Sequence, residues 1–189
     1  MNLYKPMILT LSFLFMLPAM TTNAQYIEKD GTNIQLCLFN PLQVAPEESN
    51  VYGLRVTVPY GVNNSVYGLD FGLWSETTGY QYGVQANGLV AYHEEDADGF
   101  NLAGIVNYTE KNSTGCIIGG IYSEVKNKMT GFQAAVAIAK ARQVVGVQLS
   151  LFNYCEDLKG VQLGLININN NGMIPFTIIL NFGNSDRDK

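Results

Sequence analysis

The sequence repeats one short pattern along most of its length. The stretch "IQLCLFN" at residues 34–40 returns as "VQLSLFN" at 147–153 and as "VQLGLIN" at 161–167, and its fourth position changes among Cys, Ser and Gly. Related stretches begin at Ile34, Leu54, Leu69, Val84, Phe100, Cys116, Phe132, Val147, Val161 and Ile174. After a first step of 20 residues, these starting points lie 13 to 16 residues apart. A period this constant indicates a repeat architecture, in which each unit buries its apolar side against its neighbours.

Each unit has the alternation of a half-buried strand. In "GVQLSLFN" (146–153), Val, Leu and Leu point to one side, while Gln and Ser point to the other. Stretches rich in Gly, Asn, Asp and Ser, such as "SETTG" and "CEDLKG", separate the units and supply turns. Several middle units carry one extra residue, often at Gly88, Gly104 or Gly120, which is typical of a β-bulge. The sequence therefore predicts an all-β chain.

Two all-β architectures fit such units, and we favour a parallel β-solenoid of about nine to ten strand-turn units of 14–16 residues. A solenoid makes every unit structurally equivalent, as a repeat of one strand and one turn requires. It also explains the recurrence of Asn40, Asn107, Asn153 and Asn167, whose side chains can stack as hydrogen-bonded ladders at the corners. The alternative is an up-and-down β-barrel, which the aromatic residues near the ends of many segments favour.

The chain divides into four regions. Residues 1–24 combine a positive flank at Lys5, an apolar run and a small residue before Gln25, as a cleaved secretory signal does. Residues 25–50 form an N-terminal unit with a cap or linker, 51–183 form the β-repeat domain, and 184–189 are a polar tail. We expect an exported protein, in the periplasm, the outer membrane or on the surface of a bacterial cell.

The repeated G-[VL]-Q-[LI]-[GS]-L-x-N units, "VYGLDFGLWSETTG" and the closing "NGMIPFTIILNFG" resemble a group of bacterial surface-repeat proteins that carry such units behind a signal peptide. The resemblance covers residues 51–183 and is strongest in "GVQLSLFNYCEDLKGVQLGLININNNGMIPF". The middle units "GCIIGGIYS" and "GFQAAVAIA" lack parts of the pattern. The resemblance implies an exported repeat architecture and no particular activity, because no activity is established for that group.

Composition argues against several classes of function. The net charge of −5, with no dense cluster of Lys and Arg, argues against a nucleic-acid binder. The chain has a single histidine, His93, and no G-x-S-x-G motif. We interpret His93 as a solvated turn residue and expect no catalytic residue and no cofactor. The three cysteines, Cys37, Cys116 and Cys155, allow at most one internal disulfide, and we interpret them as small apolar residues of the core.

An acidic loop holds the candidate metal ligands. Glu94, Glu95, Asp96 and Asp98 crowd one inter-strand turn, and oxygen-rich short loops suit calcium. No bidentate Glu follows at the spacing of a complete calcium loop. The alternative interpretation is a solvated acidic turn that keeps the strand edges soluble.

The remaining candidates form a surface row. We expect Gln85, Gln133, Gln148 and Gln162 to line the outside of the stack and to bind an extended glycan or protein partner at the envelope. The sequence thus predicts a non-enzymatic interaction or structural module of the envelope. The alternative function is a small outer-membrane β-barrel with a structural or pore role, which brings membrane association with it.

Overall fold

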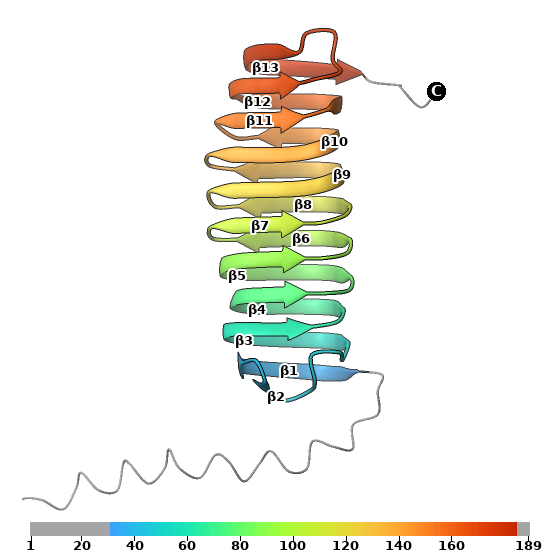
Figure 1. The fold of residues 1–189 in the computed structure, drawn as a ribbon, viewed down its shortest axis with the longest axis vertical. Helices are drawn as coiled ribbons and strands as arrows, with labels where there is room; N and C mark the ends of the chain where they lie inside the picture. Colours follow the sequence, from blue (N-terminus) through green and yellow to red (C-terminus); the bar gives the residue numbers. More distant parts are fainter. Residues whose placement is uncertain (1–30, 185–189) are drawn as a thin grey trace, which may run out of the picture.

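The computed structural model describes residues 31–184, and this range is built of strands without a helix (Figure 1). The strands wind into a β-solenoid of about nine turns with roughly 16 residues each, and we call each turn a coil. The predicted all-β solenoid is therefore confirmed. The strands are β1 (Thr32–Phe39), β2 (Leu42–Gln43), β3 (Val51–Asn63), β4 (Val66–Thr77), β5 (Gln81–His93), β6 (Ala97–Ala103), β7 (Val106–Thr109), β8 (Ser113–Gly119), β9 (Tyr122–Ala135), β10 (Ile138–Leu149), β11 (Phe152–Cys155), β12 (Asp157–Asn169) and β13 (Phe176–Asn184). The predicted signal segment and most of the polar tail lie outside the described residues.

Equivalent residues of successive coils lie in register. β3 pairs with β4, and β4 with β5, in parallel, so that Gly53 lies beside Gly68 and Gly68 beside Gly83. The same parallel pairing continues through β12. The strand order is open, running from β13 at one end to β2 at the other. The up-and-down barrel is therefore wrong, because it would need antiparallel neighbours and a closed sheet.

Each coil has two flat faces joined by two corners. β6 and β8 belong to the first face, and β7 and β11 belong to the second face, which follows it in the chain (Figure 1). β4 bends around the corner between the first and second faces, and the register of β4 and β5 skips a residue there, next to Gly88. The predicted extra residue is thus a bulge at this corner. β9 and β10 pass through the opposite corner, which leads to the next coil (Figure 1).

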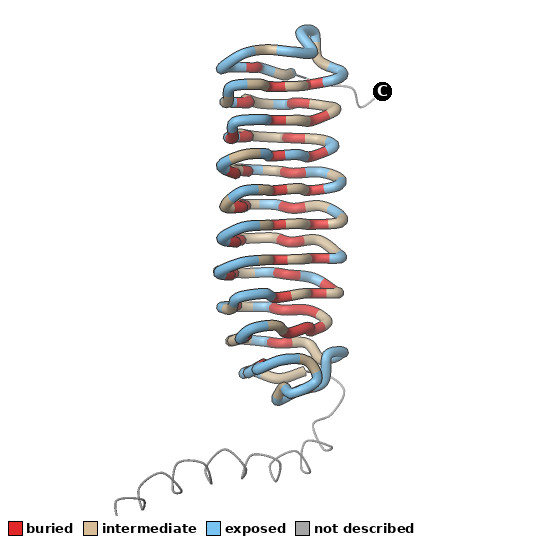
Figure 2. The backbone as a smooth tube through the Cα atoms, turned by 60° about the vertical axis from the view of Figure 1, so that its left-hand side comes forward, coloured by how far each residue is buried: buried red, intermediate tan, exposed pale blue. Residues whose placement is uncertain are grey.

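Buried residues recur at matching places in successive coils (Figure 2), and most of them are polar. Gln85, Gln133, Gln148 and Gln162 are fully buried, so our prediction that they line the outside is wrong. Strand alternation separates two sides of a strand without telling which side is inside. Here the amides face inward because they satisfy one another: Gln148 Nε2 donates to Gln133 Oε1 at 3.0 Å, and Gln162 Nε2 donates to Gln148 Oε1 at 2.8 Å.

A smaller apolar core lies beside this amide column in the middle and C-terminal coils. Ile117, Val125, Met129, Val144 and Leu158 form one buried cluster, which also includes Ala141 and Cys155. Of the four asparagines expected to form a ladder, Asn153 donates to Asn167 at 2.8 Å inside the stack. Asn107 donates instead to a backbone carbonyl, and Asn40 bonds Glu47 outside the core. The predicted ladder is thus limited to the last two coils.

A column of glycines allows the coils to stack closely on the first face. Gly83 has a φ of +131°, and a Cβ added there would lie 2.1 Å from the carbonyl oxygen of Gly68. Gly115 has a φ of +121°, with the carbonyl oxygen of Gly99 at 2.2 Å from such a Cβ. Only glycine fits both the backbone conformation and the approach of the neighbouring coil.

Other segments cover the two ends of the stack. At the N-terminal end, Gln35 Nε2 donates to the carbonyl of Ala45, and Ala45 N donates back to Gln35 Oε1, both at 2.9 Å. At the C-terminal end, β13 reverses direction and pairs antiparallel with β12. There Asn181 donates to Gln162 at 3.1 Å and ends the amide column. The last coil therefore has its interior amide satisfied.

Candidate interaction surface

The most distinctive surface surrounds the corner between the first and second faces, and we call it the apolar ridge. Four columns of outward residues make it up, and none of these residues is charged. Two columns lie on the first face: Ile34, Leu54, Leu69, Val84, Phe100, Cys116, Phe132, Val147 and Val161; and Leu36, Val56, Phe71, Ala86, Leu102, Ile118, Ala134, Leu149 and Leu163. The corner column is Leu38, Val58, Leu73, Leu89, Ile105, Ile121, Val136, Leu151 and Leu165, and the second-face column is Tyr60, Trp74, Val90, Val106, Tyr122, Ile138, Phe152 and Ile166.

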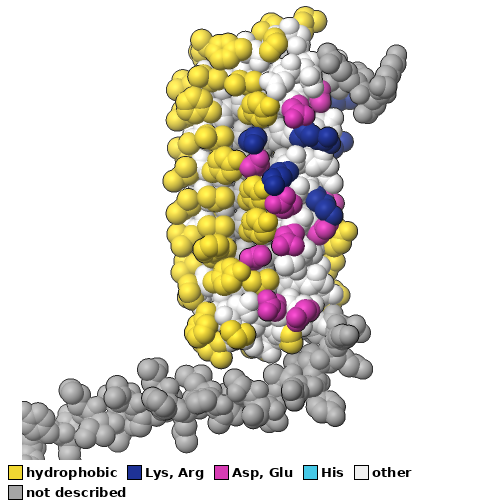
Figure 3. Space-filling view, in the orientation of Figure 1, with side chains coloured by type: hydrophobic (Ala, Val, Ile, Leu, Met, Phe, Trp, Pro, Cys, Tyr) yellow, Lys and Arg dark blue, Asp and Glu magenta, His cyan; other side chains and the backbone are white. Residues whose placement is uncertain are grey.

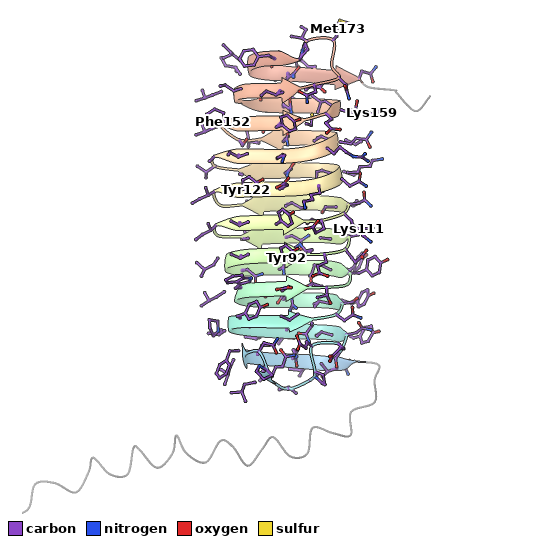
Figure 4. All side chains as sticks on the ribbon, in the orientation of Figure 1. Tyr92, Lys111, Tyr122, Phe152, Lys159 and Met173 are labelled. Carbon is purple, nitrogen blue, oxygen red and sulfur yellow. The ribbon has the colours of Figure 1, made fainter. Side chains whose placement is uncertain are left out.

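The ridge is exposed along the whole stack. Corner residues such as Leu73, Ile121 and Leu165 leave 38 %, 54 % and 57 % of their surface in water. In Figure 3 the hydrophobic side chains form an unbroken band along the left-hand edge, while charged side chains gather to the right. Figure 4 shows the same separation, with Phe152 at the ridge and Lys111 and Lys159 at the opposite corner.

The size of the ridge exceeds what folded monomers ordinarily expose. With strands about 4.8 Å apart and residues about 3.3 Å apart, nine coils and four columns give about 40 Å by about 20 Å. Contiguous apolar patches beyond a few hundred square ångströms mark interaction sites on soluble proteins. The ridge is therefore the strongest candidate for a functional surface in the described part of the chain.

Tyrosines occupy part of the columns next to the ridge, which hold charged residues such as Asp98, Glu124 and Lys140 in other coils. On the first face, Tyr52 and Tyr67 are stacked with ring centroids 5.4 Å apart, and Tyr82 continues the column. On the second face, Tyr92 and Tyr108 are stacked at 5.3 Å. Each ring offers an apolar body and a polar hydroxyl, which suits a boundary between an apolar surface and a wet one.

Ion pairs between successive coils occupy the polar corner. Lys126 Nζ lies 3.0 Å from Glu110, and Lys111 pairs with Glu95. The Tyr92 hydroxyl donates to Glu110 at 3.2 Å. Burial, together with this bond, raises the pKa of Tyr92 to about 12, and the hydrogen bond from Lys126 lowers the pKa of Glu110. Several charges near this corner are thus paired between successive coils.

The acidic loop lies at the polar corner, and its carboxylates have separate partners. Glu95 pairs with Lys111, Asp96 accepts from the backbone N of Asn112 at 2.8 Å, and Asp98 accepts from the backbone N of Thr114 at 2.9 Å. Glu94 is exposed. Among residues 31–184, no group of three or more His, Cys, Asp or Glu side chains is arranged to hold a metal ion. The structure therefore does not gather the four candidate ligands into one site.

His93 lies inside the stack, so its interpretation as a solvated turn residue is wrong. The residue is fully buried at the end of β5, where the strand alternation points its side chain inward. Its Nε2 donates to Gln85 Oε1 at 2.8 Å, and its Nδ1 accepts from Thr109 Oγ1 at 3.2 Å. Burial, reinforced by the nearby Arg55 charge, lowers the pKa of His93 to about 4. The imidazole is therefore neutral at pH 7.

The sequence reasoning missed a buried ion pair in the same network. Arg55 and Asp70 stand one coil apart in the amide column, and both side chains are fully buried. The guanidinium donates to Asp70 from Nε at 2.9 Å and from Nη2 at 2.6 Å, and Gln85 Nε2 donates to Asp70 at 2.6 Å. The signal was present in the alignment of the units, because both residues occupy a position that is Gln in most other coils. Together with His93 and Thr109, the network connects β3, β4, β5 and β7 inside the stack.

The three cysteines are free, and their positions differ. Cys37 and Cys155 are buried, as we interpreted them, while Cys116 is half-buried on the apolar ridge. Burial raises the pKa of each thiol.

Comparisons of the chain with models of known protein families, with curated proteins and with solved structures gave no match. Within residues 31–184, no helix is long and apolar enough to cross a membrane.

Proposed function

We propose that this protein is an exported, non-enzymatic interaction module of a bacterial envelope, and that the apolar ridge is its contact surface. The export part of this proposal is supported by the N-terminal signal pattern and by the resemblance to bacterial surface-repeat proteins. The proposal replaces the glutamine row with the ridge as the binding surface, because those glutamines are buried.

The observation that carries the proposal is that four uncharged columns face outward over the whole length of the stack, with the corner column exposed in every coil. Positions that only face water are expected to hold polar residues, as they do at the opposite corner of this chain. Fully burying an exposed apolar side chain is worth about 1.5–3 kcal/mol. The ridge side chains are already partly buried, so each contributes a fraction of this and the contact gains its strength from many coils. Binding to a partner therefore explains the outward apolar columns, which the stability of the fold in water does not explain.

The arrangement of ionisable groups supports a binding role over catalysis. His93, Arg55 and Asp70 are fully buried and bonded to one another through Gln85. Three lysines on the surface, Lys111, Lys126 and Lys140, are paired with glutamates of the preceding coil. These groups stabilise the stack and face no cavity that a substrate could enter.

Native fractionation of the exported protein tests this proposal. We expect the wild-type protein to be recovered bound, either in a larger complex or on membranes. The variant Leu73→Ser/Leu89→Ser/Ile105→Ser removes three successive corner side chains and is expected to shift to a free monomer. The matched control Glu94→Ser/Lys111→Ser/Lys126→Ser changes three exposed residues of the opposite corner and is expected to behave as the wild type.

Recovery of the wild-type protein as a free monomer from every envelope fraction would contradict the proposed function. Equal binding of the wild type and the ridge variant would assign the contact to another surface.

A further inference from the structure

We propose that the apolar ridge binds the surface of a lipid membrane, with its side chains in the hydrocarbon and its tyrosines at the headgroup level. This inference rests on the proposed function and names the partner of its contact surface. It follows from the shape of the ridge, from the residues at its borders and from the distribution of charge.

The ridge is convex, and its shape favours a fluid partner. Its columns lie on both faces of the stack and on the corner between them, so a flat protein surface can cover only one side. If two copies met through the first face, they would bury two columns each, about 40 Å by about 10 Å, or roughly 400 Å². Stable protein pairs bury about 800 Å² on each partner. Lipid hydrocarbon adapts to a convex edge and can cover all four columns together.

The residues at the borders of the ridge suit a membrane interface. Trp74 and Tyr60 lie in the second-face column with ring centroids 5.3 Å apart, and the stacked Tyr92 and Tyr108 follow one outward position further on. Tyr52 and Tyr67 border the first face. Tyrosine and tryptophan are enriched at the boundary between hydrocarbon and water, because their rings are amphipathic. The solenoid thus has an apolar edge with aromatic residues beside it in the N-terminal and middle coils.

A shallow hollow on the ridge is suited to a hydrocarbon chain. It has a volume of about 530 Å³ and lies at the corner in the C-terminal coils. Leucines line it at Leu149, Leu151, Leu163 and Leu165, and the small residue Gly164 lies among them. Ser150 is the one polar side chain in the lining, so the hollow offers little hydrogen bonding to a soluble ligand, whereas an acyl chain needs none.

The charge distribution predicts which membranes are bound. The net charge is −5, and Lys111, Lys126 and Lys140 are each paired with a glutamate of the preceding coil. Lys111 and Lys126 lie at the polar corner, while Lys140 lies in the column beside the ridge with its charge paired to Glu124. The three paired lysines therefore offer little attraction to anionic headgroups. Binding then depends on apolar burial, which is insensitive to salt, and electroneutral membranes are sufficient.

Vesicle flotation with the processed, exported protein tests this inference. The probes are vesicles of phosphatidylcholine alone and vesicles that also contain phosphatidylglycerol, each at low and high salt. We expect flotation with both compositions, with less than a twofold change between salt concentrations. The variant Leu73→Ser/Leu89→Ser/Ile105→Ser is expected to partition at least tenfold less, and Glu94→Ser/Lys111→Ser/Lys126→Ser is expected to float as the wild type.

The single tryptophan provides a second readout that needs no variant. Trp74 lies on the ridge and is 46 % exposed, so membrane contact is expected to shift its fluorescence to the blue. Phosphatidylcholine with brominated acyl chains is expected to quench it. An unchanged Trp74 spectrum at saturating lipid would overturn the inference.

The remaining outcomes separate this inference from the proposed function. Flotation only with phosphatidylglycerol at low salt would overturn a hydrocarbon contact. A protein that does not float but sediments as a dimer, or is bound in native envelope fractions, would overturn the lipid partner and leave the interaction module standing. A protein that neither floats nor is bound in native fractions would overturn both.

Discussion

At the scale of single residues, the structure requires glycine at position 115 and makes the buried His93 sensitive to pH. Replacing Gly115 by Ala places a Cβ 2.2 Å from the Gly99 carbonyl oxygen at a φ of +121°. The strained backbone alone costs about 1–3 kcal/mol. We therefore expect chemical denaturation to give a free energy of unfolding lower by at least this amount. The control Thr114→Ala changes an exposed neighbour and is expected to cost less than about 0.5 kcal/mol. Equal stability of Gly115→Ala and the wild type would contradict the close stacking.

His93 makes the stability of the stack depend on pH. Its folded-state pKa is about 4 and its ordinary value is 6.5, so the unfolded chain binds the proton more tightly. Stability therefore rises with pH between about 4 and 6.5, and acidification across this window costs up to about 3 kcal/mol. Denaturation at several pH values measures the slope. The variant His93→Thr introduces the threonine that the neighbouring coils have at this position, as Thr77 and Thr109. It is expected to lose the dependence of stability on pH between pH 5 and 6.5.

At the scale of elements, the inward column that holds Arg55 and Asp70 is hydrogen-bonded across neighbouring strands at both ends of the stack, and Ile117 interrupts it in the middle. Arg55 on β3 and Asp70 on β4 replace the glutamines found in other coils. Arg55→Gln leaves the Asp70 carboxylate buried without its cation, which costs about 3–5 kcal/mol. The double variant Arg55→Gln/Asp70→Gln restores two amides, as in Gln148 and Gln162. We expect a double-mutant cycle to show recovery of most of the loss, and strictly additive losses would contradict the amide column.

The sequence predicted the elements well and their inward sides poorly. The constant period and the single-strand unit are enough for a parallel stack, since every coil must be equivalent. The amides of Gln85 and Gln148 looked like surface residues because most glutamines are exposed. They are buried because the coil interior is narrow and each amide finds its partner one coil away. That partner becomes visible only when the stacking register is known, and His93 was misplaced for the same reason.

The sequence reasoning missed the apolar ridge because it also assigned the apolar side of each strand to the interior. Leu149 and Leu163 were assigned to the core because apolar residues in alternating strands usually face inward. In a small coil with a polar interior, the apolar side of the same pattern faces outward. The absence of charges from these columns is visible in the aligned units, and it is the signal from which an interaction surface could have been found.

At the scale of the whole molecule, stability is a sum over coils and their neighbours. Deleting residues 132–146 removes one coil and joins Gly131 to Val147 in the same register. We expect a shorter solenoid that keeps its β-sheet circular dichroism and unfolds cooperatively with a lower free energy. Deleting only residues 139–146 removes half a coil and breaks the register, so this smaller deletion is expected to unfold the chain. A folded half-coil deletion would contradict the stack.

The ridge is also a property of the whole molecule, because no single coil presents an apolar area large enough to hold a partner. The most direct test of its role is thiol accessibility in the intact envelope. Leu89→Cys reports on the ridge, and Lys111→Cys reports on the polar corner. Both variants also carry Cys116→Val, which removes the half-buried thiol and introduces the valine that later coils have at this position, as Val147 and Val161. Cys37 and Cys155 are buried and stay in place.

With a water-soluble thiol reagent, we expect Lys111→Cys to be labelled in the envelope and Leu89→Cys to be protected at least tenfold. In the purified protein, both positions are expected to react at similar rates. Equal labelling of the two positions in the envelope would mean that the ridge faces water, and would contradict its role as the contact surface.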